Sequence, residues 1–452
     1  MKKYINYRLL IFGAFMLVGC EDFLNQKPDQ ALITPNSLEE LRALLDNNTQ
    51  AMNQEPTYLE GASDDILIRE SLYNTLTPIN KNIYIWDPQI YDTPSIIDWT
   101  LPFSQILYAN TVLFELEKFG EAEKSSLEWK DLKGSALFYR AYAYFSLARQ
   151  FCLGYDKGKA EELLGLPLRT SPVIDQPNSR ANLKETFALI INDLQEAESL
   201  LGTSSSFVTR PTKPAASAML SRVYLYMGFF QESLNYADLA LTYRNEILDY
   251  NAVNSVPARP FVNQFEEVIF YSDLLFATFY FFNAGAEVVP DLVGLYEPYD
   301  LRKSLFFFKR GEGYAFKGQY SFQVRLFGGL ATDELYLNKA ECHARLNQGE
   351  LAVETINKLL EKRFVSGMFE PLVYSNDGEA LQMVKKERRK QLLLRGIRWG
   401  DLKRYNLLPG EEVTLTRNTP DGNFDLQPHD LRYAFPIPED EILLSGIAQN
   451  PR

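Results

Sequence analysis

One proline-rich stretch of the sequence places aromatic rings beside short polar side chains. Tyr84, Trp86 and Tyr91 follow Asn82, and Asp87 stands between them. Flat aromatic rings suit the apolar faces of sugar rings, while amide and carboxyl groups suit the hydroxyl rims. We therefore expect Asn82 and the three rings to contribute to a carbohydrate-binding surface, with Trp86 as its main platform.

A second stretch, residues 250–330, is also rich in Phe, Tyr, Gly and Pro. Tyr280 precedes two phenylalanines and Asn283, and Tyr314 is followed by Lys317 and Gln319. We expect Tyr280 and Tyr314 to join the same ligand surface. The alternative is that the rings fill the core beneath long loops. An exposed Trp86 predicts that Trp86→Ala weakens binding at nearly constant melting temperature, whereas a core Trp86 predicts a large loss of stability.

The sequence offers little for catalysis. It contains no HExxH, GxSxG or P-loop motif and only two histidines, His343 and His429. The pair Asp64-Asp65 could serve glycoside hydrolysis in principle, but most acidic pairs are solvated.

The three cysteines, at 20, 152 and 342, form no CxxC pair, so a zinc site is not expected. We expect no catalytic residues, no metal and no cofactor. Cys152 and Cys342 are predicted to be buried free thiols, with a disulfide between them as the alternative.

The N-terminus has the pattern of a bacterial lipoprotein signal. Lys2, Lys3 and Arg8 precede a short apolar run that ends in LVGC at residues 17–20. We expect residues 1–19 to be removed and Cys20 to be acylated, which anchors the mature chain to a membrane; an ordinary secretory signal is the alternative. Loss of the three positive charges takes the formal net charge from −13 to −16. Such an acidic chain is not expected to bind nucleic acid.

The scaffold is predicted to consist of helical hairpins. Between Pro214 and Tyr243, two apolar faces with helical spacing flank Gly228, and small residues permit close helix packing. This is the tetratricopeptide arrangement, in which a hairpin needs stacked neighbours to bury its face. A second such hairpin is predicted for about 332–360.

Further helices are indicated by caps and periodicity. Ser37 caps one helix, and Asn182 with Glu185 caps another. Others are expected at about 104–119, 125–152 and 378–405. Residues 50–98 are expected to form a long ordered loop region, and 250–330 loops and short strands. The fold class is therefore mainly α, a tetratricopeptide-like α-α superhelix with loop-rich insertions at about 50–98 and 250–330, in a single domain at 20–452.

Several segments, taken in order, resemble the SusD/RagB family of outer-membrane lipoproteins. The most specific is RGIRWGDLKR at 395–404, although Gly400 stands where a large residue is common in the family. The other matching segments are CEDFL at 20–24, YRAY at 139–142, GLPL at 165–168, RPTK at 210–213, FPIP at 435–438 and QNP at 449–451.

The resemblance implies a function in nutrient uptake. Members work with SusC-type TonB-dependent transporters, so we expect an outer-membrane protein facing the outside that binds a glycan and delivers it to such a transporter, without catalysis. A peptide ligand, as in the RagB branch, is one alternative, and a secreted glycoside hydrolase on a repeat scaffold is another. Arg388, Arg398 and Arg404 are predicted to pair with carboxylates of the fold rather than with a ligand.

Overall fold

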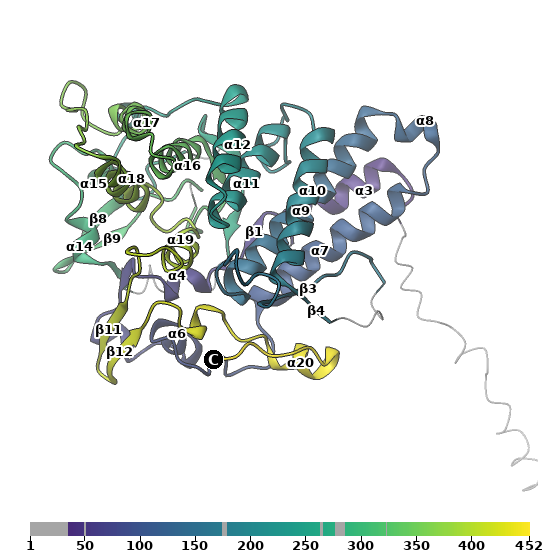
Figure 1. Cartoon of the computed structure of the whole chain (residues 1–452), viewed down its shortest axis with the longest axis horizontal. Helices are drawn as coiled ribbons and strands as arrows, with labels where there is room; N and C mark the ends of the chain where they lie inside the picture. Colours follow the sequence, from purple (N-terminus) through teal and green to yellow (C-terminus); the bar gives the residue numbers. More distant parts are fainter. Residues whose placement is uncertain (1–34, 49–50, 174–178, 263–264, 276–284, 322) are drawn as a thin grey trace, which may run out of the picture.

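The computed structural model describes residues 35–48, 51–173, 179–262, 265–275, 285–321 and 323–452. Its longer helices are α3 Leu38–Leu45, α7 Ile97–Leu116, α9 Leu127–Phe151, α10 Leu183–Leu200, α11 Lys213–Tyr226, α12 Phe230–Tyr243, α16 Thr332–Arg345, α17 Gly349–Glu361, α18 Asp377–Gln391 and α19 Arg398–Tyr405. Figure 1 shows α3, α7, α9 and α10 at one end, α16, α17 and α18 at the other, and α11 and α12 between them. The expected fold class, mainly α with tetratricopeptide-like hairpins, is confirmed.

The predicted central hairpin is formed by α11 and α12. Pro214 stands in the first turn of α11, where its missing N–H costs nothing, and Gly228 makes the turn with φ +73°. The small side chains of Ser221, Ala237 and Ala240 are fully buried between the two helices. Because α10 packs on α11 and α16 packs on α12, the apolar faces of the hairpin are covered on both sides.

The second predicted hairpin, α16 and α17, is also present. Its turn is made by Asn347, which has φ +58°, a conformation that asparagine tolerates better than most residues. Helix α18 packs on both arms. The repeats therefore stack in the order α10, α11, α12, α16, α17, α18, which gives each hairpin the neighbours it needs.

The caps were predicted correctly and the helix ends less so. The Ser37 side chain accepts from the N–H of Glu40, and Asn182 and Glu185 form a full capping box. Helix α7 begins at Ile97, before the predicted start near 104, and it continues through Pro102, which lies inside the helix and removes one intrahelical N–H bond. The predicted helix at 125–152 begins at Leu127, with Ser126 as its cap.

The basic helix expected at about 378–405 is wrong as a single element. Helix α18 ends at Gln391 and α19 begins at Arg398, and the segment between them turns through Leu394 at φ +58° and Gly396 at φ +72°. The apolar residues at 392–394 continue the helical spacing, so the break leaves no trace in the hydrophobic pattern.

Short elements fill the two irregular regions. Residues 50–98 are not only loop, since they form α4 Tyr58–Ala62, α5 Glu70–Tyr73 and α6 Pro78–Tyr84. The remaining helices are α8 Glu121–Lys124, α14 Pro290–Val293, α15 Arg302–Phe306, α20 Glu439–Ser445 and the 3-10 helices η2 Tyr250–Ala252 and η4 Leu431–Tyr433. The strands are β1 Gln54–Glu55, β2 Ile66–Leu67, β3 Leu164–Pro167, β4 Arg180–Asn182, β5 Val268–Phe270, β6 Asp273–Leu274, β7 Glu287–Val288, β8 Phe307–Arg310, β9 Gly313–Phe316, β10 Leu330–Ala331, β11 Leu415–Thr419 and β12 Gly422–Leu426.

The expected free thiols are confirmed: Cys152 and Cys342 are both buried and unpaired. Burial raises the pKa of the Cys152 thiol to about 11, so it is protonated at neutral pH. Among the described residues, no helix is long and apolar enough to cross a membrane. Cys20 and the rest of the signal segment lie outside the described residues.

Candidate ligand-binding face

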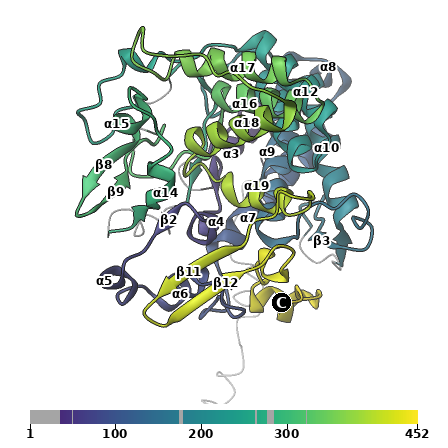
Figure 2. The same ribbon diagram turned by 60° about the vertical axis from the view of Figure 1, so that its left-hand side comes forward.

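The two irregular regions meet on one side of the molecule. Strand β1 pairs in parallel with β6, and β2 pairs antiparallel with β7 through Ile66–Val288 and Leu67–Glu287. In Figure 2, α5 and α6 of the first region and β8, β9 and α14 of the second lie along the same side of the molecule. The two predicted aromatic regions therefore form one loop-rich face.

Two of the three predicted rings of the first region are buried. Trp86 is 2% exposed and Tyr84 is 1% exposed. The indole N–H of Trp86 donates to the carbonyl of Ala62 at 2.8 Å, and the Tyr84 hydroxyl accepts from the N–H of Ile68 at 3.1 Å. The expectation that these rings are exposed platforms is wrong. The rings fill the core beneath the loops, as the alternative prediction stated.

A buried arginine of the protein itself packs on these two rings. The guanidinium carbon of Arg417, on β11, lies 4.2 Å from the Tyr84 ring centroid and 5.3 Å from that of Trp86. Arg417 also donates to the backbone carbonyls of Ile66 and Ser63. The polar partner of the two rings is thus part of the protein's own C-terminal β-hairpin.

The polar residues of the first region bind its backbone. The amide of Asn82 donates to the carbonyls of Gln89 at 3.0 Å and Ile90 at 3.2 Å, which closes the loop after α6. Tyr91 is half-buried and packs on the main core, and its hydroxyl has no hydrogen-bond partner. Burial raises the pKa of Tyr91 well above its usual value. Asn82 therefore closes the loop, and Tyr91 packs on the core beside it.

The second region keeps one predicted ring accessible. Tyr314 is half-buried on β9, and the Lys309 ammonium on the paired strand lies 4.8 Å from its ring centroid. Phe308 on β8 is 40% exposed and was not predicted. The register places Phe308 and Tyr314 on opposite faces of the β8–β9 hairpin. Tyr314 shares its face with the buried Phe307 and Phe316, and the sequences FFKR and GYAF show no alternation that could have separated these rings from Phe308. Tyr280 lies outside the described residues.

An ion pair joins the first region to β7, the strand on which the β8–β9 hairpin packs. Arg69 donates to both carboxylate oxygens of Glu287, at 2.8 and 2.6 Å. The Glu287 side chain is 5% exposed and that of Arg69 is 47% exposed. Glu287 packs so closely on Gly313 that a Cβ there would lie 1.9 Å from a carboxylate oxygen. This glycine is what allows the hairpin to approach β7.

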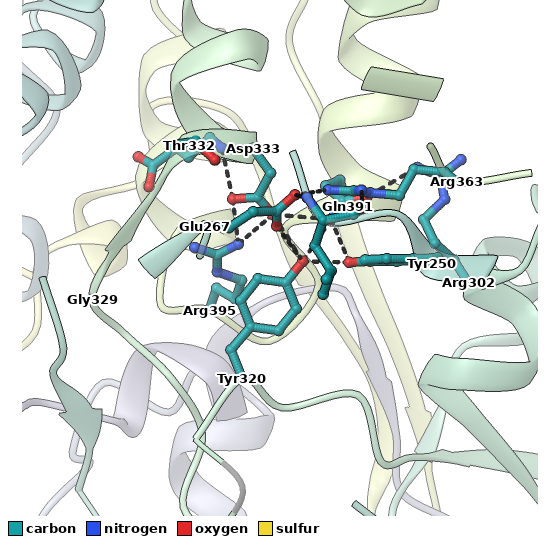
Figure 3. A network of polar contacts seen from close by, with 12 residues as sticks. Tyr250, Glu267, Arg302, Tyr320, Gly329, Thr332, Asp333, Arg363, Gln391 and Arg395 are labelled. Carbon is teal, nitrogen blue, oxygen red and sulfur yellow. Dashed lines mark hydrogen bonds and ion pairs between the residues drawn. The ribbon is translucent and has the colours of Figure 1, made fainter. Parts of the chain in front are cut away.

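A buried polar network supports the face from within (Figure 3). The Gln391 amide, on α18, donates to Asp333 at 2.9 Å and to the Tyr320 hydroxyl at 3.1 Å. Arg395 donates to Asp333 at 2.7 Å, and Arg363 donates to Glu267 at 2.6 Å. These contacts join the second irregular region to α16 and α18, so the loops are fixed to the repeat scaffold by charge-assisted hydrogen bonds.

The arginines of the C-terminal signature pair with carboxylates, as predicted. Arg398 binds Asp64 through two hydrogen bonds of 2.7 and 2.8 Å, which holds the Asp64 pKa well below its usual value despite burial. Arg388 donates to Asp401 at 2.8 Å, and Arg404 binds both Asp401 and Glu341. Asp65 is bound by Arg389 at 3.0 Å. The Asp64-Asp65 pair is thus part of an ion-pair network and has a structural role.

No cluster of three or more His, Cys, Asp or Glu side chains is placed to hold a metal ion in the part of the chain that the structure describes.

Comparison with protein families matches most of the chain. Residues 22–225 match a SusD-like family described as starch-binding and associating with the outer membrane, and residues 332–452 match the SusD family. The chain belongs to the SusD/RagB family. No functionally curated protein matches the sequence.

Solved structures of SusD-type proteins share the fold. A putative sugar-binding protein from Bacteroides vulgatus has a TM-score of 0.75 at 22% identity, over 92% of this chain and 99% of that one. A SusD superfamily protein from Bacteroides thetaiotaomicron also has a TM-score of 0.75, at 21% identity over 92% and 100%. One from Bacteroides fragilis has a TM-score of 0.73 at 21% identity over 91% and 98%. At these identities the likeness is one of fold.

Proposed function

We propose that this SusD-family chain is a lipid-anchored outer-membrane protein, facing the outside, that binds a nutrient glycan and delivers it to a SusC-type TonB-dependent transporter. The observation that carries the proposal is the match of both halves to SusD families, one of them described as starch-binding and associating with the outer membrane. The lipoprotein signal that ends at Cys20 supports the anchor.

The ligand is assigned to the loop-rich face, with Tyr314 as its ring contact. Tyr314 is half-buried on β9 and packs on the core beneath this face, and its hairpin packs against β7, which Arg69 and Glu287 join to the first region. Tyr280 remains a predicted contact on the basis of its sequence. Trp86 and Tyr84 support this face from the core, and Asn82 and Tyr91 shape the loop beside it.

A glycan panel tests the binding role. The purified chain without its signal segment and Cys20 is passed over immobilised glycans and, in parallel, over peptide mixtures. Retention of a glycan that is recovered at unchanged length supports a glycan binder. Retention of peptides alone would assign the chain to peptide uptake, and shortened glycans would indicate a hydrolase.

The transporter is a separate part of the proposal. A tethered binder has no pore, so uptake requires a channel, and the helical repeats offer a rigid surface for it. We expect an interface of at least standard size, about 1,600 Å². Mild detergent extraction with an affinity tag on this chain tests it. Co-purification of a barrel of the TonB-dependent class is expected. Recovery of the tagged chain alone, while other outer-membrane complexes stay intact, would overturn a stable complex.

A further inference from the structure

A surface pocket of about 530 Å³ lies beside helix α17, in the part of the stack that α16, α17 and α18 form (Figure 1). This volume is in the range of ligand sites, about 300–1,000 Å³. Helix α17 forms the floor, η2 and the residue before it form one wall, and the loop at 365–371 forms the other. The described residues that line the pocket include none of the β8–β9 hairpin, so the pocket is separate from Tyr314.

The outer wall of the pocket is fixed at both ends by side-chain amides. Asn251 donates to the carbonyl of Phe364 at 2.9 Å and accepts from the N–H of Ser366 at 3.0 Å. Asn357, on α17, donates to the carbonyl of Leu372 at 3.2 Å and accepts from its N–H at 2.9 Å. The pocket is therefore formed before a ligand binds, and little entropy is lost in ordering the loop.

The floor of the pocket carries charged side chains that the fold does not use. Glu354, Lys358 and Glu361 lie on one face of α17, at i, i+4 and i+7, and span about 10 Å of the helix. All three are exposed, and within the described chain none of them is hydrogen-bonded or ion-paired. The other two charged residues of the lining, Asp249 and Lys362, pair with each other at 3.2 Å. The floor thus offers two carboxylate acceptors on either side of an ammonium donor.

Phe369 adds apolar surface to the outer wall. Its ring is half-buried and packs on Phe364, with the two ring centroids 5.3 Å apart. A ring beside alternating acceptors and donors suits a sugar, which has apolar ring faces and hydroxyl groups that both donate and accept.

Other ligand classes fit this lining less well. An anion would meet three carboxylates and only two ammonium groups. A peptide could not add as a strand, because the lining elements in the described chain are a helix, a 3-10 helix and a loop.

We propose that this pocket is a second glycan-binding site, which takes a short neutral glycan segment. Phe369 packs on a sugar ring face, and Glu354, Lys358 and Glu361 bind its hydroxyl groups. The proposal rests on the glycan-binding function proposed above. Two sites on one chain raise the affinity for a long glycan when both are engaged.

Calorimetric titration with maltotriose, cellotriose, xylotriose and mannotriose tests this proposal. The Tyr314→Ala variant weakens the loop-rich face, so the binding that remains in it reports on the pocket. We expect saturable binding of a trisaccharide of this panel to Tyr314→Ala. Adding Phe369→Ala should weaken that binding about tenfold. Adding Met368→Ala instead, a 42% exposed neighbour outside the lining, should leave it unchanged.

The charged floor gives a second measurement that does not depend on ring packing. Lys358→Ala and Glu361→Ala change exposed side chains, so the fold is retained, and each should weaken the same binding severalfold. The matched control is Glu350→Ala, an exposed residue of α17 outside the lining, which should bind as its parent does. A crystal soaked with the bound trisaccharide should show the sugar against Phe369.

The glycan panel with the wild type decides the proposed function separately. A trisaccharide whose binding is weakened by Tyr314→Ala but unaffected by Phe369→Ala, Lys358→Ala and Glu361→Ala would overturn the pocket and leave that function intact. Absence of trisaccharide binding to Tyr314→Ala would also overturn the pocket. Peptide retention that Phe369→Ala abolishes, without trisaccharide binding, would assign the pocket to peptides and overturn the proposal.

Discussion

The guanidinium of Arg417 lies over the ring of Tyr84, with its carbon 4.2 Å from the ring centroid. Trp86 faces the same guanidinium at 5.3 Å. Residues more than 330 positions apart in the sequence thus form a buried cation–aromatic contact between the first irregular region and the β11–β12 hairpin. The contact explains why two rings with the composition of a sugar platform belong to the core.

Trp86→Ala should therefore destabilise the protein strongly. Removal of a buried tryptophan leaves a cavity and costs about 3–5 kcal/mol, and here Arg417 also loses a ring neighbour. Urea unfolding measures the change in free energy. The control Phe207→Ala removes a ring that is 55% exposed and should cost little. Equal stability of Trp86→Ala and the wild type would contradict the buried position.

The ion pair of Arg222 and Glu334 should behave as a buried pair. Arg222 binds both oxygens of Glu334, at 2.8 and 2.6 Å, and the side chains are 5% and 2% exposed. Glu334→Gln leaves Arg222 uncompensated, and we expect a loss of about 3–5 kcal/mol in unfolding free energy. The control is Glu161→Gln in the exposed pair with Lys184, which should change the unfolding free energy little, because solvent screens an exposed pair. Similar losses in the two variants would show that Glu334 is not buried as described.

Glu60 should make stability fall as pH rises. Burial, with Asp65 nearby, raises the pKa of Glu60 to about 8, although it accepts from the N–H of Gly396. Between about pH 5 and 8 the folded protein holds a proton that the unfolded chain has lost, so this group lowers the unfolding free energy by roughly 1.4 kcal/mol per pH unit. The decline ends above the folded pKa.

Glu60→Gln should flatten this part of the pH profile, while Glu354→Gln on the exposed side of α17 should not. Chemical denaturation at pH 6, 7 and 8 measures the unfolding free energy of the wild type, Glu60→Gln and Glu354→Gln. A Glu60→Gln profile as steep as that of the wild type would assign the pH dependence to other groups.

Cys20→Ala should release the chain from the membrane. Each buried CH₂ of an acyl chain contributes about 0.8 kcal/mol, so several chains anchor firmly and their loss leaves no anchor of that kind. Cell fractionation with an antibody to the chain measures how the protein is distributed between the membrane fraction and the soluble fraction. Unchanged membrane association of Cys20→Ala would contradict lipid anchoring through this residue.

Local features of the fold could be read from the sequence. The caps at Ser37 and Asn182 and the turn at Gly228 depend on neighbouring residues, and each is found where it was predicted. Long-range contacts could not be read in this way. The pairing of Leu67 with Glu287 depends on the whole stack, and the break at Leu394 lies in a run of leucines that could equally continue a helix.

The candidate site was harder to predict because composition does not reveal what a polar side chain binds. Asn82 looks like a ligand contact by type and position, yet its amide is used by the backbone of its own loop. The exposure of a ring depends on such local bonds and on distant partners such as Arg417. Tyr314 is half-buried on β9, and its contact with a ligand stays a prediction.

The most direct test of a glycan-binding function is a calorimetric titration with a glycan that the wild-type chain retains, followed by chromatography of the recovered glycan. We expect saturable binding and a recovered glycan of unchanged length. Tyr314→Ala should weaken binding about tenfold, since a stacked ring contributes on the order of 1 kcal/mol beyond its buried area. Phe308→Ala, on the opposite face of the hairpin, and Phe207→Ala should bind as the wild type does. Shortened glycan, or full affinity in Tyr314→Ala, would contradict a non-catalytic glycan site at this residue.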